Sequence, residues 1–166
     1  MRLVAVSLLL VLIFGVGCGG SDGDPSDPEE AEIADRSVPT DDYVTQADDV
    51  CRDVGQRVLA LREELRTAES RSQAADILAR QLEIIRDMRR RLAARGAPDG
   101  NREVAEELIA DIADAEPHLQ DTIDALRTGD EKRANEAGQR YAEASLESAR
   151  QVRDSGLDFE VCGSGA

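Results

Sequence analysis

The sequence predicts an all-α fold, an up-down-up-down four-helix bundle that follows an N-terminal signal peptide and a disordered tether. Three observations predict it. Apolar residues recur every three or four positions in four segments of about 25 residues, which is the spacing of one helix face. Short stretches of turn-forming residues separate these segments. Aromatic residues make up only 2% of the chain, so the core has to be built from aliphatic side chains.

The first segment, residues 1–17, has the order of a secretory signal peptide. A positive charge at Arg2 precedes the apolar run 3–14, and small residues surround the predicted cleavage point before Cys18. The run is shorter than the about 20 residues that a spanning helix needs. A cysteine at this point is typical of a lipoprotein signal, in which the cysteine is acylated and becomes the first residue. Gly15 stands where such signals usually carry leucine, so cleavage by ordinary signal peptidase is the alternative.

Residues 18–40 are predicted to form the lipidated cysteine and a disordered acidic tether. Gly, Ser, Asp and Pro dominate the first part, and acidic residues continue to Asp35. Such a composition buries too little apolar surface to fold. The tether would hold the helical domain, residues 41–166, away from the bilayer. Lipidation of Cys18 therefore predicts an extracytoplasmic protein whose membrane partner is reached through its lipid anchor.

The chain has three cysteines, Cys18, Cys51 and Cys162. An exported protein meets an oxidising environment, where an odd thiol needs an explanation. Acylation of Cys18 leaves an even pair, so we predict a disulfide between Cys51 and Cys162. In the chain-entropy model a loop of about 110 residues contributes roughly 4–5 kcal/mol to stability. Two buried free thiols are the alternative.

The first helix is predicted from about Asp41 to Ala68, with Thr40 as its N-cap. Acidic residues in the first turn suit the helix dipole. Its apolar face consists of Tyr43, Ala47, Val50, Val54, Val58, Leu61 and Leu65. Cys51 lies beside this face, so a disulfide from it would join the first helix to the C-terminal tail.

The second helix is predicted to start with a capping box of Ser70 and Gln73 and to run to about Arg95. Its apolar face consists of Leu78, Leu82, Ile85, Met88 and Leu92. Gly96 is a typical helix end, and residues 97–100, Ala-Pro-Asp-Gly, indicate a turn.

The third and fourth helices are predicted over residues 101–129 and 130–155. The third carries Val104, Leu108, Ile112, Ala115, Leu119, Ile123 and Leu126 on one face. Pro117 lies inside it and is expected to kink it. Thr128 and Glu131 suggest a capping box for the fourth helix. Its inner face is built from small residues that allow close helix approach: Ala134, Ala137, Tyr141, Ala144, Ser145, Ser148 and Val152.

No catalytic site, metal site or cofactor is predicted. His118, the one histidine, follows Pro117 and is interpreted as structural, because a catalytic triad or a di-iron site needs partners that the sequence does not supply. An acidic stripe on the third helix is interpreted as a solvated face, with weak calcium binding as the alternative. The stripe consists of Glu103, Glu107, Asp111 and Asp114, with Glu106 beside it.

The net charge of the chain indicates which classes of partner are expected to bind. The net charge of −15 repels phosphate, so nucleic acid is not expected to bind. Five arginines gather near the end of the second helix: Arg86, Arg89, Arg90, Arg91 and Arg95. We expect them to pair with the acidic residues of the antiparallel third helix. Contact with anionic lipid or wall polymer is the alternative.

The two ends of the predicted domain carry motifs. Residues 43–51 read Tyr-x-x-x-Ala-Asp-x-x-Cys, and the tail runs from Gly156-Leu157 to Cys162-Gly163. With the signal that ends in a cysteine, these motifs resemble a largely uncharacterised group of small helical lipoproteins of actinobacteria and their relatives. The resemblance covers the ends of the folded part. It implies a fold and a location, but no activity and no functional residues beyond the cysteines.

These observations predict a non-catalytic domain with a structural or partner-binding role, its partner being an envelope protein or a wall polymer. The alternative is an envelope solute-binding or sensing module with a ligand pocket between helices. The expected kink at Pro117 and the small residues of the fourth helix could frame such a pocket. No motif for nucleophilic catalysis or phosphate binding occurs, which argues against an enzyme.

Overall fold

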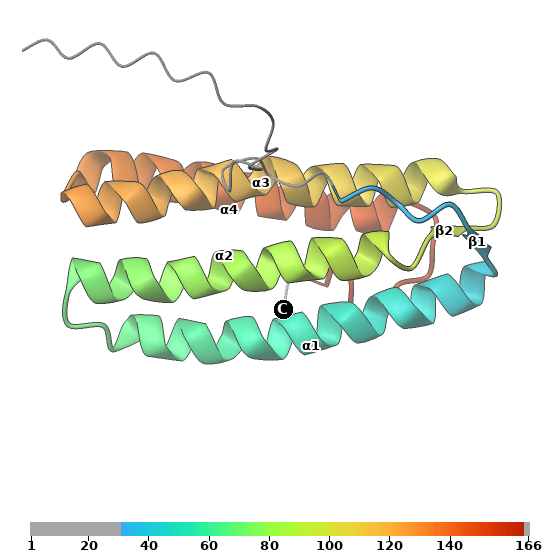
Figure 1. Cartoon of the computed structure of the whole chain (residues 1–166), viewed down its shortest axis with the longest axis horizontal. Coiled ribbons are helices and arrows are strands. Elements are labelled where there is room, and N and C mark those ends of the chain that lie inside the picture. The colour runs from blue at the N-terminus through green and yellow to red at the C-terminus, as the bar shows by residue number, and fades with distance from the viewer. Residues whose placement is uncertain (1–30, 165–166) are drawn as a thin grey trace, which may run out of the picture. The chain divides into compact units, whose positions relative to one another are not determined.

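The computed structural model describes residues 31–164, so the predicted signal peptide, Cys18 and most of the predicted tether lie outside the described residues. Four long helices make up nearly all of this part (Figure 1). They are α1 (Thr40–Arg66), α2 (Arg71–Ala93), α3 (Arg102–Thr128) and α4 (Glu131–Asp154). The predicted all-α four-helix architecture is confirmed, and each helix begins and ends within a few residues of its predicted bounds.

The helices pack in sequence order and leave one seam open. α1 packs on α2, α2 on α3, and α3 on α4, with the last pair in the most extensive contact (Figure 1). α1 and α4, by contrast, scarcely approach each other. The predicted topology places the end of the fourth helix beside the start of the first. The tail after α4 does reach α1, as that topology requires. The helix α4 itself does not pack on α1.

The core is aliphatic, as the composition predicts. Its most deeply buried large side chains include Val50, Leu92, Leu119 and Ile123, together with Tyr43. α4 contributes little, because its buried residues are limited to Ala134, Ala137 and Val152. α3 continues through Pro117 as a single helix. The bundle is therefore built mainly on α1, α2 and α3, with α4 laid against α3 through small side chains.

The packed domain begins earlier than predicted, at Ala31 instead of residue 41. Ile33 is buried in the core, and a two-residue strand β1 (Ser37–Val38) pairs in parallel with β2 (Ala97–Pro98), where a simple turn was expected. Gly96 permits this pairing, because its φ is +83° and a Cβ there would lie 2.5 Å from a backbone oxygen of Arg36. The prediction of a disordered tether up to residue 40 is thus wrong for its last residues. Backbone hydrogen bonds and one apolar side chain order them despite their acidic composition.

The helix starts agree with prediction at α2 but not at α1 or α4. The hydroxyl of Ser70 accepts the backbone N–H of Gln73 at 3.2 Å, as predicted. Thr40 is the first residue of α1 and gives no side-chain cap. At α4 the cap is Asp130, which accepts the backbone N–H of Arg133 at 3.0 Å. Thr128 cannot cap α4, because it is still the last residue of α3.

Candidate functional site

The C-terminal tail, residues 156–164, crosses from the end of α4 to α1 and is fixed there by a disulfide. Cys51 of α1 and Cys162 of the tail are bonded, with their Cα atoms 5.4 Å apart and a sequence separation of 111. Cys162 is only 4% exposed, so the bond lies within the core. The predicted pairing is confirmed, and the alternative of two free thiols is wrong.

A buried carboxylate holds the same tail by its backbone. Asp48, one helical turn before Cys51, is only 5% exposed. Its carboxylate accepts the backbone N–H groups of Glu160 at 2.7 Å, Val161 at 3.0 Å and Cys162 at 2.8 Å. These hydrogen bonds compensate the buried negative charge of Asp48 and satisfy three backbone N–H groups of the tail. A buried charge or a buried N–H group without a hydrogen bond would destabilise the fold. The sequence interpretation gave Asp48 no role, although it lies in the motif that carries the resemblance.

An aromatic contact completes the attachment of the tail. Tyr43 is 1% exposed and meets Phe159 edge to face, with ring centroids 6.5 Å apart. Burial raises the pKa of Tyr43 to about 12. We call these five residues, Tyr43, Asp48 and Cys51 of α1 with Phe159 and Cys162 of the tail, the tail clasp. The tail clasp therefore gives a structural role to the tyrosine, the aspartate and the cysteine of the motif at residues 43–51.

Beyond the tail clasp, the open seam forms a groove of about 530 Å³ between α1 and α4. Its walls include Val54 and Val58 of α1 and Leu146 and Val152 of α4, and its floor includes Ile85 and Met88 of α2. The tail lines it near the disulfide, where Cys51 and Cys162 face it. Leu146 is 60% exposed on the wall. We call this feature the α1–α4 groove; it is mainly apolar and opens onto the core.

Polar groups in the α1–α4 groove gather toward the end away from the disulfide. Arg62 is the one charged side chain among the described residues that line it. Gln81 of α2 donates to the hydroxyl of Tyr141 on α4 at 3.1 Å, which links the floor to the wall. The ion pair between Arg80 and Glu64 joins α1 to α2 in the same region, and Arg62 and Gln81 both line the groove. One end of the groove is thus polar and the other apolar.

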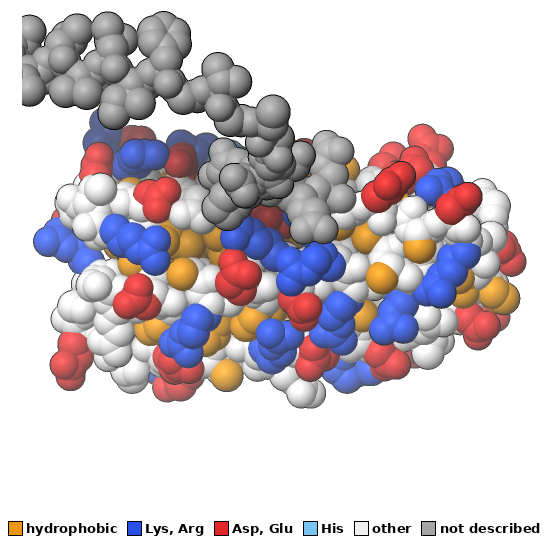
Figure 2. All heavy atoms as spheres, viewed as in Figure 1, with side chains coloured by type: hydrophobic (Ala, Val, Ile, Leu, Met, Phe, Trp, Pro, Cys, Tyr) orange, Lys and Arg blue, Asp and Glu red, His pale blue; other side chains and the backbone are white. Residues whose placement is uncertain are grey.

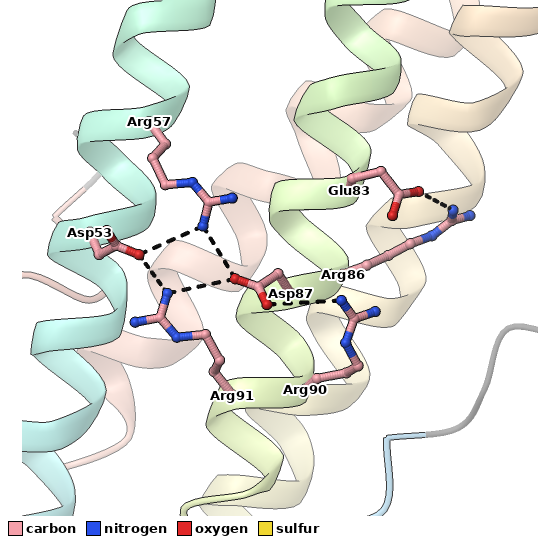
Figure 3. Close-up of polar contacts among 7 residues, drawn as sticks. All are labelled: Asp53, Arg57, Glu83, Arg86, Asp87, Arg90 and Arg91. Atoms are coloured by element: carbon pink, nitrogen blue, oxygen red, sulfur yellow. Dashed lines mark hydrogen bonds and ion pairs between the residues drawn. The ribbon is translucent and has the colours of Figure 1, made fainter.

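The arginines of α2 pair with carboxylates, but mostly not with those of the predicted stripe. Arg91 of α2 and Arg57 of α1 both bridge Asp53 of α1 and Asp87 of α2 (Figure 3). The hydrogen bond from Arg91 is the main cause that lowers the pKa of Asp53 below its ordinary value. These pairs join α1 to α2, and Arg90 pairs with Asp87 within α2, so the expectation that the cluster would pair across to the third helix is wrong for Arg90 and Arg91.

Two arginines of the cluster do reach α3, through one buried residue. Arg89 and Glu116 form an ion pair at 2.8 Å, and the side chains are 8% and 6% exposed. Arg86 approaches the other oxygen of Glu116 at 3.4 Å. Glu116 was not among the predicted stripe residues. Its burial beside two guanidinium groups fixes the register of α2 against α3.

The predicted acidic stripe lies on α3, and its residues are exposed or partly buried. Burial raises the pKa of Asp111, and the nearby carboxylates Asp114, Glu107 and Glu147 add to this effect. Within residues 31–164 no three His, Cys, Asp or Glu side chains converge as a metal site requires. His118 is partly buried, and no hydrogen bond or ion pair joins its imidazole to another described residue. Neither feature therefore belongs to a group of metal ligands within the described residues.

A second hollow, of about 650 Å³, lies over α1, α2 and α3. Figure 2 shows apolar side chains between interleaved basic and acidic groups on the face that carries these helices. Its rim carries four arginines: Arg57, Arg80, Arg86 and Arg127. Each of them already forms an ion pair with Asp or Glu. Because its cations are neutralised in place, this hollow is a weaker candidate for a binding site than the α1–α4 groove.

No protein-family model, no curated protein and no solved structure matches this chain. Among α1 to α4, the helices of the described part, none combines the length and the apolar character needed to cross a membrane. The features that bear on function are therefore the α1–α4 groove, the tail clasp and the signal in the sequence.

Proposed function

We propose that this chain is a membrane-anchored extracytoplasmic lipoprotein with a non-catalytic binding domain, and that the α1–α4 groove is its binding surface. The signal that ends at Cys18 supports the anchor. The disulfide between Cys51 and Cys162 supports export, because such bonds persist in oxidising compartments. It also leaves Cys18 as the one cysteine outside the pair, as acylation requires.

The observation that carries the binding role is the open seam between α1 and α4. A four-helix bundle normally closes this seam and buries the side chains on both sides. Here apolar residues of all four helices line the groove, and although most of them are buried, Leu146 of α4 stands 60% exposed on its wall. Apolar surface that gathers in one concave place is typical of a binding site, whereas scattered single residues are not.

The same groove favours a ligand over a purely structural role, and a ligand pocket between helices is the alternative that the sequence left open. Its volume of about 530 Å³ is within the range of small-molecule sites, about 300–1,000 Å³. Its lining is mostly apolar with a few polar groups at one end, which is the usual composition of such sites. A ligand pocket between helices is therefore the more specific form of the proposal.

The anchor and the groove are tested separately in cells. Mass spectrometry of the native protein should find diacylglycerol on Cys18, and a mature N-terminus elsewhere would contradict the anchor. A photo-crosslinking amino acid at Leu146 should capture a molecule, whereas the same probe at Glu147, exposed on another side of α4, should not. Equal yields at the two positions, or none, would contradict a binding role for the groove.

A further inference from the structure

We propose that the α1–α4 groove holds a single long acyl chain whose anionic head group lies against Arg62. The proposal rests on the binding function proposed above and names the class of its ligand. Three features of the groove carry it: its length, the position of the one cationic side chain among its described lining residues, and a glycine in its wall.

The groove has the dimensions of one hydrocarbon chain. It extends along α1 from Cys51 to Arg62 and along α4 from Tyr141 to Val152. At 1.5 Å per residue each of these spans is about 16 Å. An extended chain of about twelve methylenes has this length at roughly 1.3 Å per carbon.

The charge at one end identifies the head group. α1 carries four arginines, and three of them, Arg52, Arg57 and Arg66, form ion pairs with nearby carboxylates. Arg62 forms none with any described residue, although the chain is strongly acidic. A guanidinium left without a carboxylate at the end of an apolar groove is complementary to a carboxylate or a phosphate. The side chains of Gln81 and Tyr141 lie at the same end and offer further hydrogen bonds.

A glycine keeps the groove wide. Gly55 lines the α1 wall in the interior of a helix, where glycine costs roughly 0.5–1 kcal/mol relative to alanine. A Cβ added at Gly55 would meet nothing within 4 Å, so packing of the domain itself does not require glycine there. The far end of the groove meets the disulfide and offers no charged side chain. An acyl chain would therefore lie with its methyl end near Cys162.

The test uses the full chain with Cys18→Ser, which is exported without an acyl group and purified without detergent. Myristate and a 14-carbon lysophosphatidate, whose chains match the length of the groove, are titrated by calorimetry, so that carboxylate and phosphate head groups are compared directly. Either should bind with one molecule per chain. Arg62→Gln should weaken the binding about tenfold or more, as expected for loss of a charge-assisted hydrogen bond. The matched control Arg52→Gln, outside the groove, should leave it unchanged.

A second variant blocks the groove without weakening the fold. Gly55→Leu places a side chain in the groove and favours the helix, so it should abolish binding while the melting temperature stays level or rises. Failure of both probes to bind, or binding that survives Gly55→Leu, would overturn the proposal. Tetradecanol binding as tightly as myristate would overturn the role of Arg62. The crosslinking at Leu146 decides the proposed function separately, because a captured small molecule of another class would support a ligand pocket even if no acyl chain binds.

Discussion

Replacing Asp48 with asparagine is expected to lower the free energy of unfolding by about 3 kcal/mol. The carboxylate accepts three backbone N–H groups of the tail, and a hydrogen bond to a charged group is worth about 1 kcal/mol more than one to a neutral group. The asparagine amide would also turn a donor toward the N–H of Glu160. For a domain of this size the loss corresponds to a fall in melting temperature of about 10 °C.

Urea denaturation followed by circular dichroism measures this change, with Asp49→Asn as the matched control. Asp49 is the next residue on α1, its side chain is 67% exposed, and it pairs only with Arg52. Its replacement should cost less than about 0.5 kcal/mol, as is usual for exposed pairs. If Asp48→Asn cost no more than Asp49→Asn, the carboxylate would not hold the tail and the tail clasp as described would be wrong.

The disulfide and Asp48 act on the same segment, so their effects should not add. Replacing Cys51 and Cys162 together with serine should cost up to about 4–5 kcal/mol in the chain-entropy model. In that background the tail is free to leave α1 and Asp48 is free to hydrate. Asp48→Asn should then cost clearly less than it does with the disulfide present, which a double-mutant cycle measures. Strict additivity would contradict a shared role in the tail clasp.

Three further predictions address other parts of the domain. Burial raises the pKa of Tyr43 to about 12, so the free energy of unfolding should fall by about 2–3 kcal/mol as the pH rises from 10 to 12. Tyr43→Phe should remove this fall from the plot of unfolding free energy against pH, whereas Tyr141→Phe should leave the fall in place. Arg89→Met should cost up to about 3 kcal/mol in urea denaturation, because it leaves the buried Glu116 with only the longer contact to Arg86, and the double variant with Glu116→Leu should recover most of the loss. Gly96→Ala should release β1, since a Cβ at φ +83° would collide with the backbone of the N-terminal segment; unchanged hydrogen-exchange protection of residues 31–38 would refute the pairing.

The helices and the disulfide were predictable because each leaves a local or countable signal. The apolar faces repeat with the helical period over many turns, so that chance spacing is excluded. The pairing of Cys51 with Cys162 followed from counting thiols in an exported chain. Neither prediction depends on which helices are in contact, because the first uses the helical period and the second uses the number of thiols.

The tail clasp and the ordered N-terminal segment left no such signal. Asp48 looks like any solvated acid near the start of a helix, because its partners are backbone N–H groups far away in the sequence. Backbone donors carry no residue signature, so no composition argument finds them. The pairing of β1 with β2 also depends on backbone groups and therefore leaves no signal in the sequence. The apolar Ile33, which is buried, is a sequence feature that indicates packing of this acidic segment.

The open seam follows from the side chains that α4 turns toward α1. The sequence interpretation took the small residues of the fourth helix to allow close approach, which is correct toward α3, where Ala134 and Ala137 are buried. On the side that lines the groove, α4 has Ser145 and Ala149, and α1 has Gly55. Leucines at these positions would close the seam, as they do in the core between α2 and α3. The tail clasp holds the tail across one end of the seam without drawing α4 onto α1, so the fold stays stable while the groove stays open.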